Sequence, residues 1–196
     1  MFDHKITELK YHMDGLMPKA ICDSLINFFE TKKYLSETEQ SYKFKEKQNV
    51  KDNFKCINLS HFVQFDASFK KPFDIIRTYL SIVLQNYEMH LNKNICPTFE
   101  NKFFLTTTHN IRILKYEEGQ YIKDHSDFSV INRASCTINL NEGYEGGEFR
   151  FFDGRVKCSF KTGDAMIFPA EPIWIHGTDP VTKGTRYCIN CFLGPQ

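Results

Sequence analysis

Hydrophobic residues recur at helical spacing in two stretches of the first half of the chain. Within residues 73–91, apolar side chains return every three or four positions, at 73, 76, 80, 83, 84, 87 and 91, so they share one face of a helix. Residues 16–35 show the same spacing, and Pro18 suits the first turn of a helix there. Both stretches therefore predict amphipathic helices that pack against a large apolar surface.

Beyond residue 103 the pattern changes to short runs of β-branched and aromatic residues separated by Gly, Asp, Asn and Pro. The runs cover residues 110–116, 136–140, 148–152, 155–160, 165–168 and 187–192. The Asp153-Gly154 pair predicts a two-residue hairpin turn between the third and fourth runs. Many short strands in succession are typical of a β-sandwich or barrel rather than a parallel α/β sheet. We therefore expect an α+β protein with helices packed outside a β-sandwich.

The polar segment 36–53 separates the two predicted helices, and we expect it to be an exposed connection. A plain surface loop is favoured there over a substrate lid. A length of 196 residues suits a single domain, 1–196, with a helical part at about 1–100 and a β-rich core at about 103–196.

Composition and charge narrow the classes of function. Hydrophobic residues make up 41% of the chain and aromatic residues 15%, which is enough apolar material for a packed core. A net charge of +1 gives no overall field that would attract nucleic acid or an anionic membrane. No apolar stretch approaches the roughly 20 residues that span a bilayer, and residues 1–10 lack the apolar run of a secretory signal. These features predict a cytoplasmic protein that binds neither nucleic acid nor membrane.

The cysteines point to a reducing compartment. There are seven, an odd number scattered along the chain, which argues against a disulfide framework. Cys188 and Cys191 form one CxxC pair, but no second pair stands at zinc-site spacing. Ordinary buried thiols are therefore favoured over a structural zinc site.

Three side chains form a candidate metal centre. His125 and Asp127 are two residues apart, so on a strand they point to the same face, and His176 follows in a later run. Two imidazoles and one carboxylate are the ligand set of non-haem Fe(II) oxygenases, which keep other coordination positions open. Zinc accepts the same donors, and each residue taken singly is also explained as surface sequence or a hydrogen-bonded core histidine.

Arg186 lies ten residues after His176, across a turn-rich segment. A guanidinium in the interior can hold a carboxylate through two charge-assisted hydrogen bonds. A 2-oxoacid that chelates iron at one end would bring its far carboxylate to this arginine. The alternative for Arg186 is a surface ion pair.

Four stretches together resemble the catalytic domain of prolyl 4-hydroxylases, which are 2-oxoglutarate- and Fe(II)-dependent dioxygenases. The stretches are ILKYEEGQYIKDHSD, INLNEGYEGGEFRFF, FKTGDAMIFP and IHGTDPVTKGTRYCINCF, and the resemblance runs from about residue 110 to 193. It implies a double-stranded β-helix (jelly-roll, cupin-like) core with the N-terminal helices packed outside.

The resemblance also implies roles for individual residues. His125, Asp127 and His176 would be the iron ligands, and Arg186 would bind the distal carboxylate of 2-oxoglutarate, where many relatives have Lys. Tyr116 would line the cosubstrate pocket.

Three further positions are weaker candidates. Asn139 stands where several relatives have a Tyr that contacts the distal carboxylate, and Thr137 shares its face by strand alternation. Trp174, two residues before His176, would form a wall of the substrate pocket if that strand is regular. Its alternative, a core aromatic, is favoured.

The implied activity is hydroxylation of an unactivated C–H bond, coupled to oxidation of 2-oxoglutarate by O₂, with ascorbate as an accessory. The family pattern favours a prolyl residue of a peptide or protein as the acceptor. Two alternatives stay open: a hydroxylase of a free amino acid or other small molecule, and a catalytically silent jelly-roll that only binds. The complete metal set together with Arg186 counts against the silent alternative.

Overall fold

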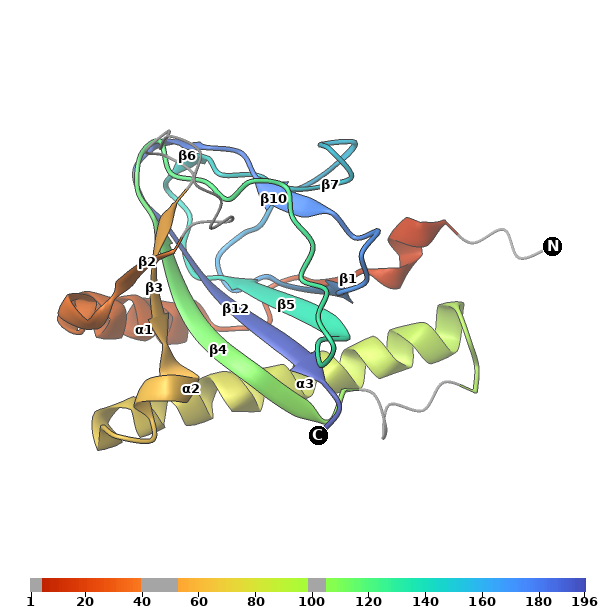
Figure 1. Ribbon diagram of the computed structural model, residues 1–196, viewed down its shortest axis with the longest axis horizontal. Coiled ribbons are helices and arrows are strands. Elements are labelled where there is room, and N and C mark those ends of the chain that lie inside the picture. Colours follow the sequence, from red (N-terminus) through yellow and green to blue (C-terminus); the bar gives the residue numbers. More distant parts are fainter. Residues whose placement is uncertain (1–4, 40–52, 99–104) are drawn as a thin grey trace.

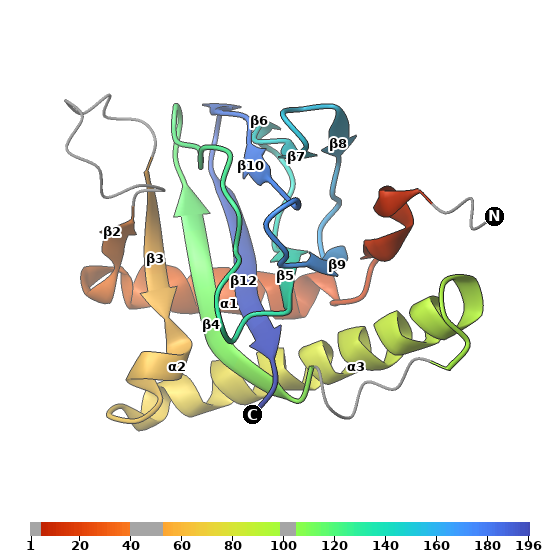
Figure 2. The same cartoon turned by 45° about the vertical axis from the view of Figure 1, so that its right-hand side comes forward.

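A seven-stranded antiparallel sheet organises the molecule, with two long helices running across one side of it (Figure 1; Figure 2). The computed structural model describes residues 5–39, 53–98 and 105–196. Its helices are α1 (Lys19–Thr31), α2 (Leu59–Phe62) and α3 (Lys70–Asn94), with short 3₁₀ turns at Ile6–Leu9, Lys33–Leu35 and Ala67–Phe69. Its strands are β1 (Tyr11–Met13), β2 (Glu37–Glu39), β3 (Phe54–Asn58), β4 (Thr107–Tyr116), β5 (Ala134–Asn139), β6 (Glu145–Gly146), β7 (Phe149–Phe151), β8 (Val156–Cys158), β9 (Ala165–Pro169), β10 (His176–Thr178), β11 (Val181–Lys183) and β12 (Arg186–Gly194).

Both predicted helices are confirmed. Pro18 caps α1 from the position just before Lys19, and the helix ends at Thr31, so it is shorter than the predicted span. The stripe on α3 is buried as expected, through Ile76, Leu80, Val83, Tyr87 and Leu91. It packs in one hydrophobic core with the helix-facing side of the sheet. This core fixes the sheet, and therefore the strands that carry the candidate site.

Alternate residues of the central strands face opposite sides. On β4, Ile111 and Ile113 belong to the core under the helices, while Leu114 and Tyr116 belong to a separate cluster on the other side. This period of two is the normal consequence of strand geometry. The sheet therefore has one face committed to the helices and one face free to form a second layer.

A smaller layer lies opposite that second face. The large sheet runs in the order β1-β9-β5-β12-β4-β3-β2, and a three-stranded sheet β10-β7-β8 and a two-stranded ribbon β11-β6 lie across from it (Figure 1). The expected architecture, an α+β protein with helices outside a two-layered β core, is confirmed. Among the described residues, no helix has the length and apolar character needed to cross a membrane.

The N-terminal part contributes strands as well as helices. β1, β2 and β3 all come from the first hundred residues and extend the large sheet at both edges. Of the predicted loop 36–53, Glu37–Glu39 forms β2, and residues 40–52 lie outside the described residues. The division into a helical part and a β-rich core stays a prediction about domain organisation.

The predicted hairpin exists, but its turn is longer than two residues. β7 and β8 pair with Phe151 opposite Val156, which leaves residues 152–155 as the loop. Phe152, Asp153 and Gly154 all have positive φ, at 54°, 55° and 80°. The Asp-Gly pair therefore marks the bend correctly, and the preceding Phe152 belongs to the loop, with its ring packed against Trp174.

Candidate active site

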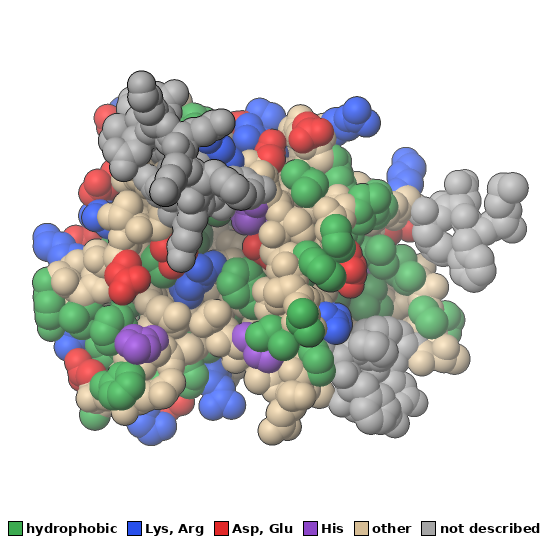
Figure 3. Space-filling view, viewed as in Figure 1, with side chains coloured by type: hydrophobic (Ala, Val, Ile, Leu, Met, Phe, Trp, Pro, Cys, Tyr) green, Lys and Arg blue, Asp and Glu red, His purple; other side chains and the backbone are tan. Residues whose placement is uncertain are grey.

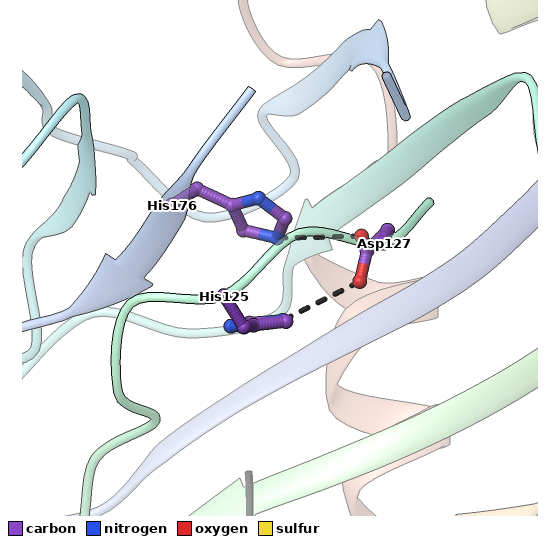
Figure 4. Close-up of side chains that lie close together, drawn as sticks. All are labelled: His125, Asp127 and His176. Carbon is purple, nitrogen blue, oxygen red and sulfur yellow. Dashed lines mark ion pairs between the residues drawn. The ribbon is translucent and has the colours of Figure 1, made fainter. Parts of the chain in front are cut away.

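His125, Asp127 and His176 meet between the two layers, although they come from two separate segments (Figure 4). Nε2 of His125 lies 3.3 Å from Oδ1 of Asp127, and Nε2 of His176 lies 3.3 Å from Oδ2 of the same carboxylate. The possible ligand atoms of the three side chains all lie within 4.8 Å of one another. The predicted candidate ligands are therefore assembled into one cluster, which we call the His-Asp-His cluster.

The cluster is positioned by one isolated bridge rather than by a regular strand. His176 opens β10, and it exchanges backbone hydrogen bonds with His125, N–H to O at 2.9 Å in both directions. The segment that carries His125 and Asp127 is irregular apart from this bridge. The expectation that the HxD pair lies on a strand is therefore wrong, because His125 forms only an isolated bridge.

Backbone carbonyls orient both imidazoles. Nδ1 of His125 lies 2.8 Å from the carbonyl oxygen of Lys123, and Nδ1 of His176 lies 3.0 Å from that of Trp174. A carbonyl accepts only, so each Nδ1 carries a proton and each Nε2 is the ring nitrogen that faces the carboxylate. Metal-binding histidines are typically held in this way.

Asp127 is an ionised carboxylate in a buried place. Burial by itself raises the pKa of Asp127, but hydrogen bonds and charge from His125 and His176 outweigh burial and hold the pKa well below its usual range. The Ser135 hydroxyl also donates to Oδ2 at 2.5 Å. A deprotonated carboxylate is the form that binds a metal ion, so the cluster needs no proton release from Asp127.

A cavity extends from the cluster along the inner face of the large sheet. The His-Asp-His cluster lines it together with Tyr116, Thr137 and Arg186, and aromatic rings of Phe149 and Phe168 flank His176. Figure 3 shows the face of the molecule seen in Figure 1 to be hollowed, with a histidine side chain visible at the hollow. The cavity therefore connects the metal-binding donors with the predicted carboxylate-binding arginine.

Arg186 supplies a buried positive charge at one end of this cavity. The residue is 2% exposed, and among the described residues its Nε–H has no hydrogen-bond partner. The guanidinium carbon lies 5.4 Å from the centre of the Tyr116 ring, and Tyr144 also lies beside the guanidinium. A buried donor without a partner costs free energy, and an anionic ligand in the cavity would offset that cost.

Gly147 makes room for that arginine. Its φ is +71°, and a Cβ placed on it would lie 3.2 Å from Cδ of Arg186 and 3.3 Å from Val181. A side chain here would be strained by the backbone and would press on the guanidinium stem. The paired glycines of the EGGE motif therefore shape the carboxylate-binding end of the cavity.

The weaker candidates separate into two groups. Thr137 lines the cavity, with its hydroxyl hydrogen-bonded to the carbonyl of Ile189 at 3.1 Å. Asn139 does not line it: its side-chain amide donates to the carbonyl of Asn141 at 2.6 Å and accepts from Tyr144. Asn139 therefore supports Tyr144, which in turn lies beside Arg186.

Trp174 also lies outside the cavity lining. It is 2% exposed and packs against Phe151, Phe152 and Phe168 in an aromatic cluster. β10 begins only at His176, so the alternation that would have turned Trp174 toward the site does not extend to it. The structure thus places Trp174 in the core, the alternative that the sequence favoured.

Sequence reasoning missed three residues that belong to the site. Ser135 bonds Asp127, Tyr144 flanks Arg186, and Arg112 lines the cavity from β4. Ser135 could have been found, since it shares a face with Thr137 by strand alternation. Tyr144 lies in a loop and Arg112 is one of many charged residues, so neither carries a local signal.

A second group of possible ligands, His12, Asp14 and Asp164, is explained structurally. Asp164 accepts hydrogen bonds from the backbone N–H of Gly15 at 2.8 Å and of Lys161 at 2.7 Å. Its oxygens are therefore already used to tie two chain segments together. Only the His-Asp-His cluster, within the described residues, combines metal donors with a cavity.

The donor set fits Fe(II), and Arg186 in the same cavity suits a dicarboxylic acid such as 2-oxoglutarate. Two imidazole nitrogens and one carboxylate are the protein ligands that non-haem Fe(II) oxygenases use. The unpartnered Nε–H of Arg186 at the far end suits the second carboxylate of a dicarboxylic acid.

Part of the chain is similar to known oxygenases. Residues 111–194 match the family model of the 2OG-Fe(II) oxygenase superfamily. A PKHD-type hydroxylase of Idiomarina loihiensis is 31% identical over 87 residues, which cover 40% of this chain and 39% of that protein. Procollagen-lysine,2-oxoglutarate 5-dioxygenase 1 of Rattus norvegicus is 30% identical over 115 residues, covering 57% of this chain and 15% of that protein. The chain thus spans less than half the length of these relatives.

Solved structures show the same fold over nearly the whole chain. A prolyl hydroxylase of Trichoplax adhaerens, solved in complex with a hypoxia inducible factor peptide fragment, superposes with a TM-score of 0.70 at 12% identity. The superposition covers 96% of this chain and 84% of that one. The two-layered core is therefore a double-stranded β-helix of the prolyl hydroxylase type. Residues 111–194, less than half of the chain, thus match the 2OG-Fe(II) oxygenase superfamily, and the fold is similar to that of a solved prolyl hydroxylase.

Proposed function

We propose that the chain is an Fe(II)- and 2-oxoglutarate-dependent dioxygenase that hydroxylates a prolyl residue of a peptide or protein. One observation carries the proposal: the His-Asp-His cluster and the buried, incompletely bonded Arg186 line the same cavity. A metal site alone would be compatible with hydrolysis or with structural zinc. Arg186 in the same cavity could bind one carboxylate of a dicarboxylic acid while the other end chelates the metal ion. This arrangement favours a metal-chelating dicarboxylate as cosubstrate.

His125, Asp127 and His176 would hold Fe(II) through the two Nε2 atoms and the carboxylate. Arg186 would bind the distal carboxylate of 2-oxoglutarate. When bound, Fe(II) and 2-oxoglutarate supply the oxidising chemistry, in which O₂ and 2-oxoglutarate yield succinate, CO₂ and a hydroxyl group on the acceptor carbon. Ascorbate would serve as an accessory reductant.

The protein itself contributes geometry and a dry environment. Burial raises the pKa of Tyr116, so its phenol stays protonated and can donate a hydrogen bond to a carboxylate. Phe149 and Phe168 shield His176, because their ring centres lie 5.4 Å and 4.8 Å from the imidazole. No side chain has to act as a general base.

A prolyl acceptor is supported by the kind of relatives and structures that the chain resembles. The Trichoplax prolyl hydroxylase favours proline, whereas the rat procollagen-lysine enzyme favours lysine. A reducing, cytoplasmic setting stays a prediction from the sequence.

The proposal is tested by succinate formation. Purified protein is incubated with Fe(II), 2-oxoglutarate, ascorbate and air, with and without a library of prolyl peptides, and a lysyl library runs in parallel. We expect succinate that rises with the prolyl library and disappears in His176→Ala. Stimulation by the lysyl library alone would show that the acceptor is a lysyl and not a prolyl residue. A folded, iron-loaded protein that forms no succinate with any acceptor would contradict the proposed activity.

A further inference from the structure

We propose that Arg112 recognises the acceptor, by donating hydrogen bonds to a backbone carbonyl of a peptide on the side of the metal site away from Arg186. The inference rests on the proposed function and deepens it, because it decides between a peptide and a free amino acid. It starts from a charged residue of the cavity that neither the metal nor the cosubstrate employs.

Strand register places Arg112 away from the carboxylate-binding end. On β12 and β4, Arg186 pairs with Tyr116, and four residues further along both strands Asn190 pairs with Arg112. Four residues of a strand span about 13 Å. On the other side of β12, Asn190 pairs with Thr137. Paired residues share a face, so these side chains form a row across the cavity floor.

The metal-binding end lies near that row. Asp127 is bonded to Ser135, which pairs with Phe192, two residues beyond Asn190 on β12. The cavity therefore has Arg186 at one end and Arg112 at the other, with the metal donors toward Arg112. Since 2-oxoglutarate would occupy the Arg186 end, the acceptor has to approach from the Arg112 end.

Arg112 is rigidly held there. Its side chain is 16% exposed, Nε and Nη2 donate to Oδ1 of Asn190, and Nη1 donates to Glu39 at 2.9 Å. The guanidinium also stacks over Phe192, with its carbon 4.8 Å from the ring centre. These contacts use three of the five guanidinium N–H groups. Among the described residues, one N–H on each terminal nitrogen is left to donate to a ligand.

The charge of this group fits a neutral acceptor. The charges of Fe(II), Asp127, Arg186 and doubly negative 2-oxoglutarate cancel, so Arg112 and Glu39 decide the charge of the acceptor side. Glu39 compensates Arg112 in a contact of 2.9 Å. The pair offers strong donors without net positive charge, which suits a peptide carbonyl better than the free carboxylate of an amino acid.

Binding measurements test this inference without turnover. The protein is loaded anaerobically with redox-inert Mn(II) and 2-oxoglutarate, and calorimetric titration then compares an N-acetylated, C-amidated Xaa-Pro-Xaa library with free proline. The variants are Arg112→Gln, Arg112→Lys and Glu39→Gln. Arg155→Gln is the matched control, because Arg155 is exposed in the β7–β8 loop. The affinity of each variant for 2-oxoglutarate is measured first, to show that the site is intact.

The expected pattern is specific. Arg112→Gln weakens binding of blocked peptides about tenfold, the loss of one hydrogen bond to a charged donor. Arg112→Lys is intermediate because it keeps the charge and loses the planar fork. Glu39→Gln shifts preference toward free proline, since it leaves Arg112 uncompensated. Arg155→Gln behaves as the unchanged protein.

Two failures are distinguishable. If the unchanged protein binds 2-oxoglutarate, but Arg112→Gln binds blocked peptides equally well, or free proline binds better than any blocked peptide, the inference is overturned and the proposed oxygenase stands. If metal-loaded protein does not bind 2-oxoglutarate, the proposed function fails, and the inference fails with it.

Discussion

Neighbouring residues hold the side chains of the proposed metal ligands in place. Lys123 and Trp174 use their backbone carbonyls to fix the two imidazoles, and Ser135 holds one oxygen of Asp127. These hydrogen bonds thus hold the two imidazoles and the carboxylate close together before any ion binds. A preformed set of donors lowers the cost of organising the site on metal binding.

Ser135→Ala tests this arrangement. Removing the hydroxyl frees Oδ2 of Asp127 to turn, so we expect Fe(II) affinity to fall about tenfold to a hundredfold. The thermal midpoint of the metal-free protein should change little. Ser159→Ala is the control, because Ser159 is exposed and outside the cavity. Unchanged Fe(II) affinity in Ser135→Ala, measured by competition with a chelator, would show that Asp127 is positioned without this hydrogen bond.

Among individual site residues, the sequence predicts those whose side-chain type and spacing are characteristic of a metal or carboxylate site. The HxD pair, the later histidine and Arg186 are recognisable from residue type and order. Asn139 and Trp174 depend instead on strand alternation, which holds only inside regular strands. Trp174 lies before β10 begins, and Asn139 is the last residue of β5 and bonds the next loop.

Among the elements, the start of β9 is tied to the N-terminal segment by one buried carboxylate. Asp164 is 3% exposed and bonds the backbone N–H groups of Gly15 and Lys161 and the side chain of His12. Burial raises the pKa of Asp164, but these hydrogen bonds outweigh it and place the pKa below its ordinary value of 3.8. The ionised form is therefore the one that stabilises the fold.

This predicts a pH dependence of stability. A carboxyl with a folded-state pKa below its unfolded value stabilises the protein above the unfolded pKa, and the contribution is lost as pH falls through the folded value. Asp164→Asn should lower the free energy of unfolding by about 1–3 kcal/mol at pH 7. The difference from the unchanged protein should shrink as the pH is lowered from about 4 towards the lower folded-state pKa of Asp164.

Urea unfolding at several pH values measures this difference. Asp14→Asn is a matched control, because the Asp14 side chain is 96% exposed. A gap between Asp164→Asn and the unchanged protein that stays constant or widens on acidification would contradict a stabilising role for the ionised carboxylate.

Elements with a long local pattern were predictable, and those that depend on distant partners were not. The apolar stripe in the sequence predicts the 25-residue helix α3. β1 and β2 have three residues each, and β3 has five. Such segments become strands because distant strands offer hydrogen bonds, as when β1 pairs with β9. Their local sequence contains no comparable signal.

In the whole molecule, the two faces of the large sheet have different roles. One face of the large sheet packs on α1 and α3, and the opposite face carries the cavity. Changes in the helical core should therefore act on stability, whereas changes on the inner face should act on binding. The smaller layer of the double-stranded β-helix covers this second face.

The cysteines provide a test of the packing. All seven lie within the described residues, none forms a disulfide, and Cys96 alone is exposed. We expect one thiol per chain to react rapidly with a water-soluble disulfide reagent in the folded protein, and seven after unfolding. Cys96→Ser should abolish the rapid reaction. Two or more rapidly reacting thiols in that variant would show that the sandwich or the helical layer is more open than described.

In the proposed reaction, one O₂ molecule would be divided between 2-oxoglutarate and an acceptor at the His-Asp-His cluster. The most direct test is turnover under ¹⁸O₂ with a blocked prolyl peptide that stimulates succinate formation, followed by mass spectrometry of both products. A 2-oxoglutarate-dependent dioxygenase predicts one ¹⁸O atom in succinate and ¹⁸O in the hydroxylated peptide, with neither product formed by Asp127→Asn. Succinate without ¹⁸O, or a peptide hydroxyl derived wholly from water, would contradict the proposed reaction.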